Sequence, residues 1–195
     1  CLVGSEMCIR DSYYDILEVQ PLGNNAYMVR EGKVESEEVI KDFNRTVIQL
    51  GEDLHKPVIA NISGFSVEEY AYCCERIDGE EQVGIIEVNV SCPNVRHGGM
   101  SFGTSPECAA EVTRAVKAVT TKPVFIKLSP NVTDIVAIAR ACEEAGADGI
   151  CLINTLLGMR IDIARRRPVI ANRMGGFSGP AIFPVALRMV YQVCE

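Results

Sequence analysis

The sequence lacks several features that would assign it to a common class at once. No apolar stretch reaches the roughly 18 residues that a transmembrane helix needs. The 195 residues carry 26 acidic and 19 basic side chains, and the net charge of −7 argues against the basic face of a nucleic-acid-binding protein. The G-x-G-x-x-G fingerprint of dinucleotide-binding folds is also missing. We therefore expect no membrane span, no nucleic-acid partner and no such dinucleotide site.

Cysteine is present but without metal-site spacing. The nine cysteines include no Cys-x-x-Cys pair, which disfavours zinc and iron–sulfur sites, so no metal is predicted. A disulfide scaffold is not expected in a chain of this length with 48% hydrophobic residues. The composition is typical of a reduced cytoplasmic protein.

The first twelve residues, "CLVGSEMCIRDS", resemble a translated sequencing adapter along their whole length. Segments of this kind are excluded from reasoning about fold. The alternative is a genuine N-terminal arm. The adapter interpretation predicts that residues 1–12 are an artefact and that the chain is a fragment.

From residue 56 onward, apolar runs alternate with amphipathic segments. Strands are expected over 56–63, 84–91, 122–129 and 148–156, and helices over 66–77, 105–120, 131–146 and 180–195, with a loop over 168–179. Ser66 is placed to cap the first helix, Pro106 stands at the first position of the second, and Asn131 or Thr133 is expected to cap the third, which Gly146 ends.

Continuous apolar strands alternating with helices predict parallel strands covered on both faces. An open doubly wound sheet and a (β/α)8 barrel both fit. Four polar residues, each taken to finish a strand, favour the barrel, where the carboxyl ends of all strands meet. They are Asn61, Asn89, Lys127 and Asn154. A barrel takes about 250 residues, so we predict an incomplete (β/α)8 TIM barrel over 45–195, truncated at both ends.

The strand-end residues suggest a ligand. A lone asparagine here is usually a turn former, but several amides together can hold a planar ligand such as a pyrimidine or a flavin edge. Lys127 either reaches solvent or a carboxylate, or supplies a fixed positive charge opposite developing negative charge. Cys92, in "VNVSCPNV", can be a packed thiol, a proton acceptor or a metal ligand, and its chemistry alone favours packing.

Four long segments then indicate a family. The segments 88–104 ("VNVSCPNVRHGGMSFGT"), 127–135, 143–162 and 171–193 closely resemble dihydroorotate dehydrogenase, in particular the catalytic subunit of the NAD-linked, two-subunit class 1B. The resemblance covers residues 56–195. It implies an FMN-containing barrel that oxidises dihydroorotate to orotate in pyrimidine biosynthesis.

The resemblance also implies roles for individual residues. Cys92 is the family's base, which removes a proton from carbon 5 of dihydroorotate while hydride leaves carbon 6. The positions matching FMN contacts are Asn61, Asn89, Lys127, Ile153 and Gly179, and those matching substrate contacts are Asn89, Asn154 and Thr155, with Asn94 a further candidate. Electrons then pass to a partner subunit that carries FAD and a 2Fe–2S cluster, and on to NAD, in a heterotetramer built on a homodimer.

The chain also departs from the family pattern. Residues 13–44 do not match it, and "EGKVE" stands where the family has its substrate-closing loop. The family's last two strands, whose glycine-rich loops hold the FMN phosphate, do not follow "MVYQVCE", so we expect this chain alone not to retain stoichiometric FMN. The alternatives are a non-catalytic barrel fragment and the FMN barrel of a dihydropyrimidine dehydrogenase-like enzyme, against which "NRMGGFSGPAI" argues.

Overall fold

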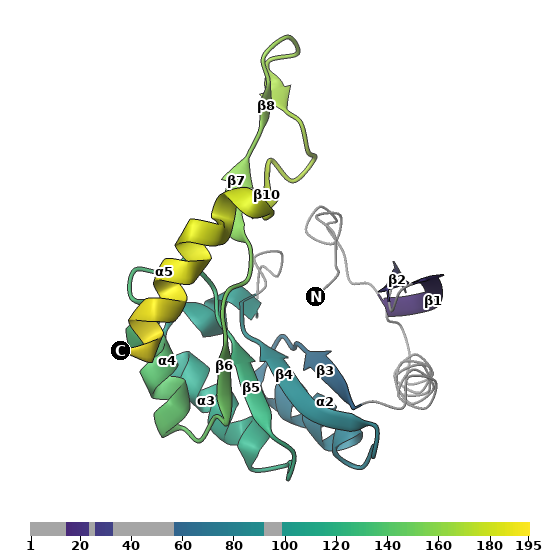
Figure 1. Ribbon diagram of the computed structural model, residues 1–195, viewed down its shortest axis with the longest axis vertical. Helices are drawn as coiled ribbons and strands as arrows, with labels where there is room; N and C mark the ends of the chain where they lie inside the picture. Colours follow the sequence, from purple (N-terminus) through teal and green to yellow (C-terminus); the bar gives the residue numbers. More distant parts are fainter. Residues whose placement is uncertain (1–14, 24–25, 33–56, 92–98) are drawn as a thin grey trace.

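A four-stranded parallel sheet forms the centre of the computed structural model, which describes residues 15–23, 26–32, 57–91 and 99–195. The strands are β3 (Val58–Ile62), β4 (Val83–Asn89), β5 (Val124–Lys127) and β6 (Gly149–Cys151). They lie side by side in chain order, all parallel (Figure 1). The predicted α/β class with parallel strands is confirmed. Over the described residues the sheet is open, with β3 and β6 at its edges.

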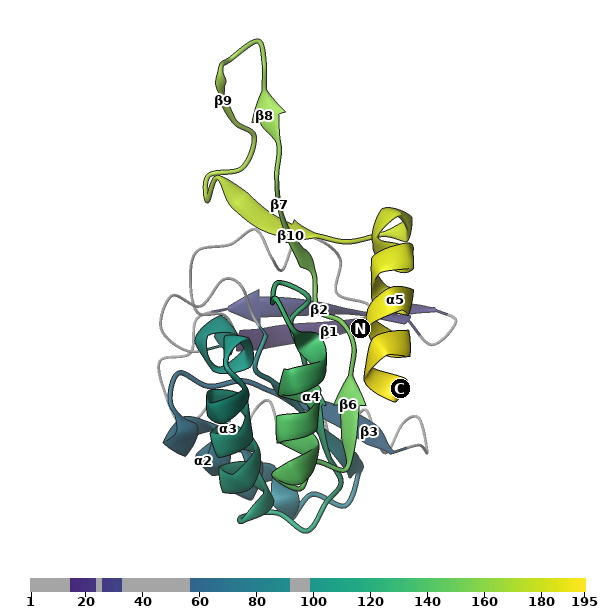
Figure 2. The same ribbon diagram turned by 90° about the vertical axis from the view of Figure 1, so that its left-hand side faces the viewer.

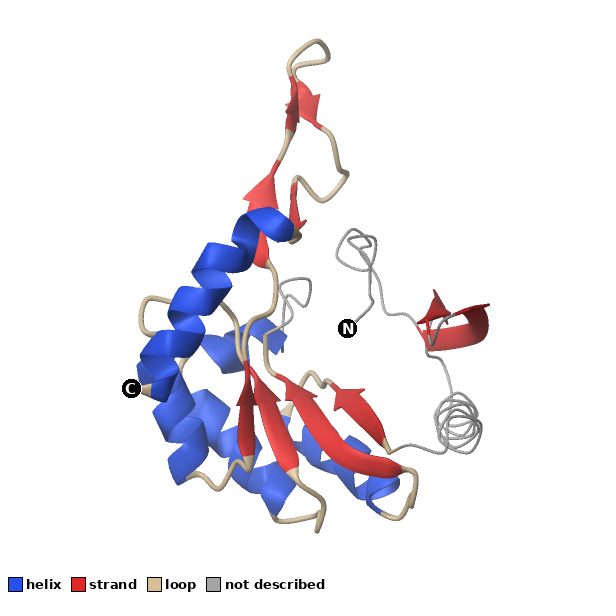
Figure 3. Cartoon of the chain, in the orientation of Figure 1, coloured by secondary structure: helices blue, strands red, loops and turns tan. Residues whose placement is uncertain are grey.

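Three helices cover one face of this sheet: α2 (Val67–Asp78), α3 (Pro106–Lys117) and α4 (Ile135–Glu144) (Figure 3). Alternate strand residues such as Ile86, Val88 and Ile126 are fully buried beneath them. No helix of the described ranges covers the opposite face, called the open face here, and Ile59 on it is 59% exposed. Over the described residues the predicted cover is thus seen on one face only, because apolar runs indicate that both faces avoid water but not which segment covers each.

The predicted Ser66 cap of the first helix and the predicted place of Pro106 in the second are confirmed, and the structure adds a Ser105 cap. Ser66 Oγ accepts a hydrogen bond from the backbone of Glu69, and Ser105 Oγ accepts one from the backbone of Cys108. Pro106 stands at the start of α3, where its missing N–H has no helical partner to lose. These serines fix where the chain turns from each strand connection into a helix.

The predicted cap of α4 was wrong. Asp134, rather than Asn131 or Thr133, accepts from the backbone N–H of Ala137 at 3.0 Å. The side chain of Asn131 instead hydrogen-bonds the backbone of Thr155 and Leu157, which follow β6. Gly146 follows α4 at φ +99, which confirms the predicted end of this helix.

The segment after β6 forms a projecting arm, defined here as residues 156–177 (Figure 2). In it β7 (Leu156–Met159) pairs antiparallel with β10 (Met174–Phe177), and β8 (Ile161–Asp162) pairs with β9 (Arg167–Pro168). The predicted strand 148–156 was thus too long, and the predicted loop 168–179 contains strand residues. Short strands with two adjacent glycines carry no alternating apolar pattern, so their pairing was not visible in the sequence.

The chain continues through η2 (Pro180–Ile182) into α5 (Phe183–Cys194), which packs against α4 and buries Met189. Before the sheet, β1 (Asp15–Gly23) and β2 (Ala26–Gly32) form an antiparallel pair, and η1 (Gly99–Thr104) leads into α3. No helix in the described ranges has the length and apolar character to cross a membrane.

Candidate active site at the carboxyl edge of the sheet

Two of the predicted residues end neighbouring strands side by side. Asn89 ends β4, Lys127 ends β5, and the two are register partners, with Cys151 next in the same row on β6. Asn61 is the penultimate residue of β3 and pairs with Glu87, so it lies one row lower. Because alternate residues share a face, these side chains belong to the open face of the sheet.

Glu87, in the lower row, binds side chains of both rows, and it was not among the residues predicted from the sequence. Oε2 of Glu87 accepts hydrogen bonds from Asn61 Nδ2 at 2.5 Å and from Lys127 Nζ at 3.3 Å. The side chains of Lys127 and Glu87 are only 17% and 16% exposed. Of the two alternatives for Lys127, the structure therefore shows the ammonium paired with a carboxylate, within reach of the open face.

Cys151 completes this group. Burial by itself raises the pKa of Glu87, but the hydrogen bond from the Cys151 thiol, the charge of Lys127 and the bond from Asn61 outweigh it, so the pKa lies below its ordinary value. Burial and the Glu87 carboxylate raise the pKa of Cys151 to about 12. At neutral pH the group holds a carboxylate, and Cys151 is a protonated thiol rather than a nucleophile.

A second group of hydrogen bonds joins Asn89, Ser91 and Asn154. Oδ1 of Asn89 accepts from the Ser91 hydroxyl at 2.8 Å and from Asn154 Nδ2 at 3.3 Å, and Asn154 Nδ2 also reaches the Ser91 hydroxyl at 2.8 Å. The Tyr70 hydroxyl donates to the backbone carbonyl of Asn89 at 2.9 Å. Since the Asn89 oxygen is occupied, its amide nitrogen is the part of the side chain that can serve a ligand.

The side chain of Asn131 hydrogen-bonds the backbone at Thr155 and Leu157. Asn131 Nδ2 donates to the Thr155 carbonyl at 3.0 Å, and its Oδ1 accepts from the Leu157 N–H at 2.8 Å. The Thr155 N–H in turn donates to Asn154 Oδ1 at 2.8 Å. These bonds fix the chain between β6 and the arm, while Ile153 packs against the core.

The remaining predicted residues lie apart from this group or outside it. Gly179 is exposed at φ +103 just before η2, with open space where a Cβ would stand. Cys92 and Asn94 lie outside the described residues. Ser91, which directly precedes Cys92, is fully buried and hydrogen-bonds both Asn89 and Asn154.

Glu87, Ser91 and Cys151 were missed from sequence alone, although a signal existed for one of them. Glu87 is a charged residue inside an apolar strand, two positions before Asn89, so strand alternation puts both on one face. Ser91 and Cys151 carry no such mark, because serine and cysteine are ordinary core and turn residues.

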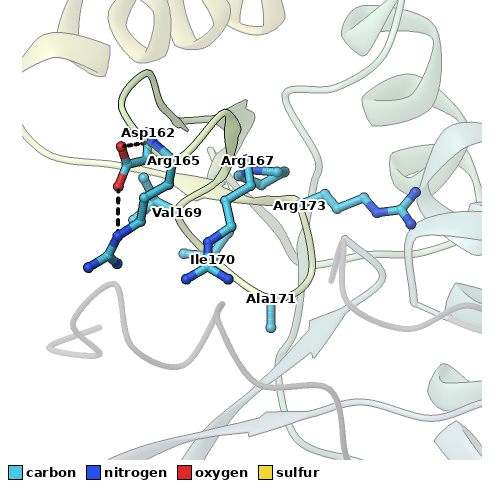
Figure 4. A pocket seen from close by; sticks show the side chains of 8 residues that line it. Asp162, Arg165, Arg167, Val169, Ile170, Ala171 and Arg173 are labelled. Carbon is cyan, nitrogen blue, oxygen red and sulfur yellow. Dashed lines mark hydrogen bonds and ion pairs between the residues drawn. The ribbon is translucent and has the colours of Figure 1, made fainter.

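A pocket of about 440 Å³ lies elsewhere, at the arm (Figure 4). Asp162 there accepts from the Arg165 backbone at 3.0 Å and lies 3.7 Å from its guanidinium. The pocket is lined by Asp162, Arg165, Arg167, Pro168, Val169, Ile170, Ala171 and Arg173. None of these belongs to the strand-end group, so the hydrogen-bonded chemistry of the sheet edge and this pocket are separate features.

A parallel sheet with polar side chains gathered at the carboxyl ends of its strands is the arrangement by which α/β enzymes build their sites. The family model of dihydroorotate dehydrogenase matches residues 20–195. The chain belongs to the dihydroorotate dehydrogenase family. The match begins at residue 20, within the segment 13–44 that was expected to lie outside the family pattern.

Individual relatives agree. The chain is 58% identical over 142 residues to "Dihydroorotate dehydrogenase B (NAD(+)), catalytic subunit" of Listeria monocytogenes serotype 4a. The aligned region is 73% of this chain and 47% of that protein. The protein of the same name from Geobacillus kaustophilus is 56% identical over 144 residues, covering 74% and 46%. The chain thus spans about half the length of the curated relatives it matches.

Among solved structures, the carboxyl transferase domain of Rhizobium etli pyruvate carboxylase with pyruvate and biocytin matches at a TM-score of 0.43 and 15% identity. That match covers 56% of this chain and 18% of the other. A likeness of this size carries no argument about fold or function.

Proposed function

We propose that the chain forms part of an FMN-binding (β/α)8 barrel that oxidises dihydroorotate to orotate in pyrimidine biosynthesis. The observation that carries the proposal is the hydrogen-bonded group of Asn89, Ser91 and Asn154 at and beyond the carboxyl ends of β4 and β6, of which Ser91 directly precedes Cys92 in the sequence. The names of the relatives support the same reaction. Because the chain covers about half of those relatives, the proposal concerns the complete gene product.

The described residues fit a flavin. A flavin ring presents carbonyl oxygens and ring nitrogens, which call for amide and ammonium donors in fixed positions. The open face offers the Lys127 ammonium and the amides of Asn61 and Asn89, held by Glu87 and Ser91. Gly179, at φ +103 with no atom within 4 Å of a would-be Cβ, leaves backbone open to a ligand. Ile153 belongs to the same proposed contact set.

In the proposed reaction Cys92 Sγ takes the proton from carbon 5 of dihydroorotate as the hydride leaves carbon 6. The bound FMN supplies the two-electron acceptor for that hydride. Asn89, Asn154 and Thr155, with Asn94, hold the pyrimidine ring so that carbon 5 faces the thiolate. Ser91, the residue directly before Cys92 in the chain, is hydrogen-bonded by Asn89 and Asn154.

A partner subunit carrying FAD and a 2Fe–2S cluster would take up the electrons and pass them to NAD. We further propose that the catalytic subunit is a homodimer within a heterotetramer. Contact with another chain is supported by the arm, which exposes Met159, Ile161, Ile163 and Val169 by 53–87%. An apolar surface of this kind beside several arginines is typical of interfaces.

The proposal retains three divisions of the chain: an adapter-derived segment at 1–12, an N-terminal segment at 13–44, and part of the barrel domain at 45–195. Sequencing the genomic DNA on both sides of the coding segment tests this division. A reading frame that replaces residues 1–12 by another sequence supports it, and the same twelve codons in the genome contradict it.

Replacing Cys92 tests the proposed chemistry. Cys92→Ser in the complete protein should lower turnover steeply near neutral pH, because a serine hydroxyl is a far weaker base, and should restore part of it as the pH rises. Cys108→Ser, a half-buried thiol on α3, is the matched control and should behave as wild type. Unchanged turnover in Cys92→Ser would remove Cys92 from the base role.

A further inference from the structure

Among the described residues, Glu87 on the open sheet face contacts side chains from all three other strands. Asn61 comes from β3, Lys127 from β5 and Cys151 from β6, and each donates to the carboxylate of Glu87 on β4. Two of these bonds fall on the same oxygen, Oε2. The position of that oxygen therefore sets the positions of both the Asn61 amide and the Lys127 ammonium.

We propose that Glu87 is a positioning residue of the flavin site, which holds Lys127 and Asn61 in the geometry from which they contact the flavin and compensates the charge of Lys127. This inference rests on the function proposed above. Nothing in the names of the relatives assigns a role to this carboxylate.

The ion pair between Glu87 and Lys127 holds the ammonium in place through its charge and its burial. A half-buried ammonium without a partner is unfavourable and turns toward solvent, whereas a carboxylate at 3.3 Å keeps it at the sheet. Among the described residues, no other ion pair involves Lys127 or Glu87. Removal of the Glu87 charge should therefore both free Lys127 and leave its positive charge uncompensated beside the flavin.

A double-mutant cycle in the complete protein separates this role from a general effect on folding. Glu87→Gln keeps the shape and removes the charge, and should weaken FMN binding by about tenfold or more, the size expected for one charge-assisted hydrogen bond. In a Lys127→Met background the same Glu87→Gln change should have little further effect, because contacts made through a shared partner are not additive. Glu111→Gln, on the exposed side of α3, should leave binding unchanged.

A second measurement needs no flavin. The Glu87 carboxylate hydrogen-bonds the Cys151 thiol and raises its pKa together with burial, so Glu87→Gln should lower that pKa. Labelling of the flavin-free protein with iodoacetamide at pH 8 to 9, read at Cys151 by peptide mass spectrometry, should be several times faster in Glu87→Gln and unchanged in Glu111→Gln.

The outcomes separate the two claims. Full additivity of Glu87→Gln and Lys127→Met in FMN affinity, or wild-type labelling of Cys151 in Glu87→Gln, would overturn the role of Glu87. A wild-type protein that binds no flavin would contradict the proposed function, while the labelling experiment still decides whether Glu87 organises this group.

Discussion

The amide nitrogen of Asn154 lies 3.3 Å from the Oδ1 atom of Asn89, although the two residues are 65 positions apart in the chain. Both contact the Ser91 hydroxyl, at 2.8 Å in each case. This triangle joins the end of β4 to the segment after β6 and stands directly before Cys92. Three uncharged side chains thus build a rigid frame at the place where the substrate is proposed to bind.

Replacement of the donor in this triangle should impair the reaction. Asn154→Asp removes the N–H groups that Asn89 and Ser91 receive and adds a negative charge beside an anionic substrate. We expect kcat/KM for dihydroorotate to fall at least about tenfold in the complete enzyme. Gln192→Glu, which adds the same charge on the exposed surface of α5, is the control. Equal kcat/KM values for both variants and wild type would rule out this role of Asn154.

A side chain at Gly103 should disturb the chain at Val90, next to Ser91. A Cβ at Gly103 would lie 2.2 Å from the carbonyl oxygen of Val90, which is backbone and cannot rotate away. Gly103→Ala should therefore destabilise the protein by about 1–3 kcal/mol and weaken flavin binding. Gly79→Ala, at φ −73 with open space around the position, should instead stabilise it by about 0.4–1 kcal/mol. Thermal melting compares the two, and equal melting temperatures would contradict the predicted clash.

The extent to which the sequence predicts this structure differs from one element to another. The succession of strands and helices followed from apolar runs and from Ser66, Pro106 and Gly146, because those signals are local. The cap of α4 was misassigned because Asn131, Thr133 and Asp134 are all good capping residues, and only tertiary contacts of Asn131 remove it from the choice.

The candidate site shows the same division. Alternation along β4 puts Glu87 and Asn89 on one face, so the sequence alone could have indicated Glu87. The bonds of Glu87 to Lys127 and Cys151 depend on strand order and register, which no single strand encodes. The arm was missed because its strands are short and its pairs form between segments that look like loops.

The loss of folding stability at low pH should depend in part on Asp78. The hydrogen bond from the Thr120 hydroxyl, helped by the N–H of Thr121, lowers the pKa of Asp78 in the folded protein. A carboxylate with a lowered folded pKa stabilises the protein above its ordinary pKa of about 3.9, and that stability is lost as the pH falls below it.

Asp78→Asn should accordingly lower the melting temperature at pH 6 by no more than a few degrees, since the carboxylate lies near the surface, where solvent screens its charge. The gap to wild type should narrow at pH 3. Asp162→Asn, on the arm, is the matched control. A gap that stays constant from pH 6 to pH 3 would show that the Asp78 carboxylate does not contribute in this way.

The arm should mediate association. Ile163 is 87% exposed on it, so Ile163→Asp should shift the complete catalytic subunit toward smaller species in size-exclusion chromatography with light scattering, because a charge buried in an apolar contact is unfavourable. Thr121→Asp, on an exposed turn before β5, should leave the mass unchanged. An unchanged mass for Ile163→Asp would remove the arm from the proposed contact.

The central claim is that the strand-end group of this chain belongs to a flavin site that oxidises dihydroorotate. Its most direct test is the anaerobic addition of dihydroorotate to the complete gene product loaded with FMN. We predict stoichiometric loss of the visible flavin absorbance with formation of orotate, and slow or absent loss in Cys92→Ser at neutral pH. A wild-type flavin spectrum that dihydroorotate leaves unchanged would contradict the account.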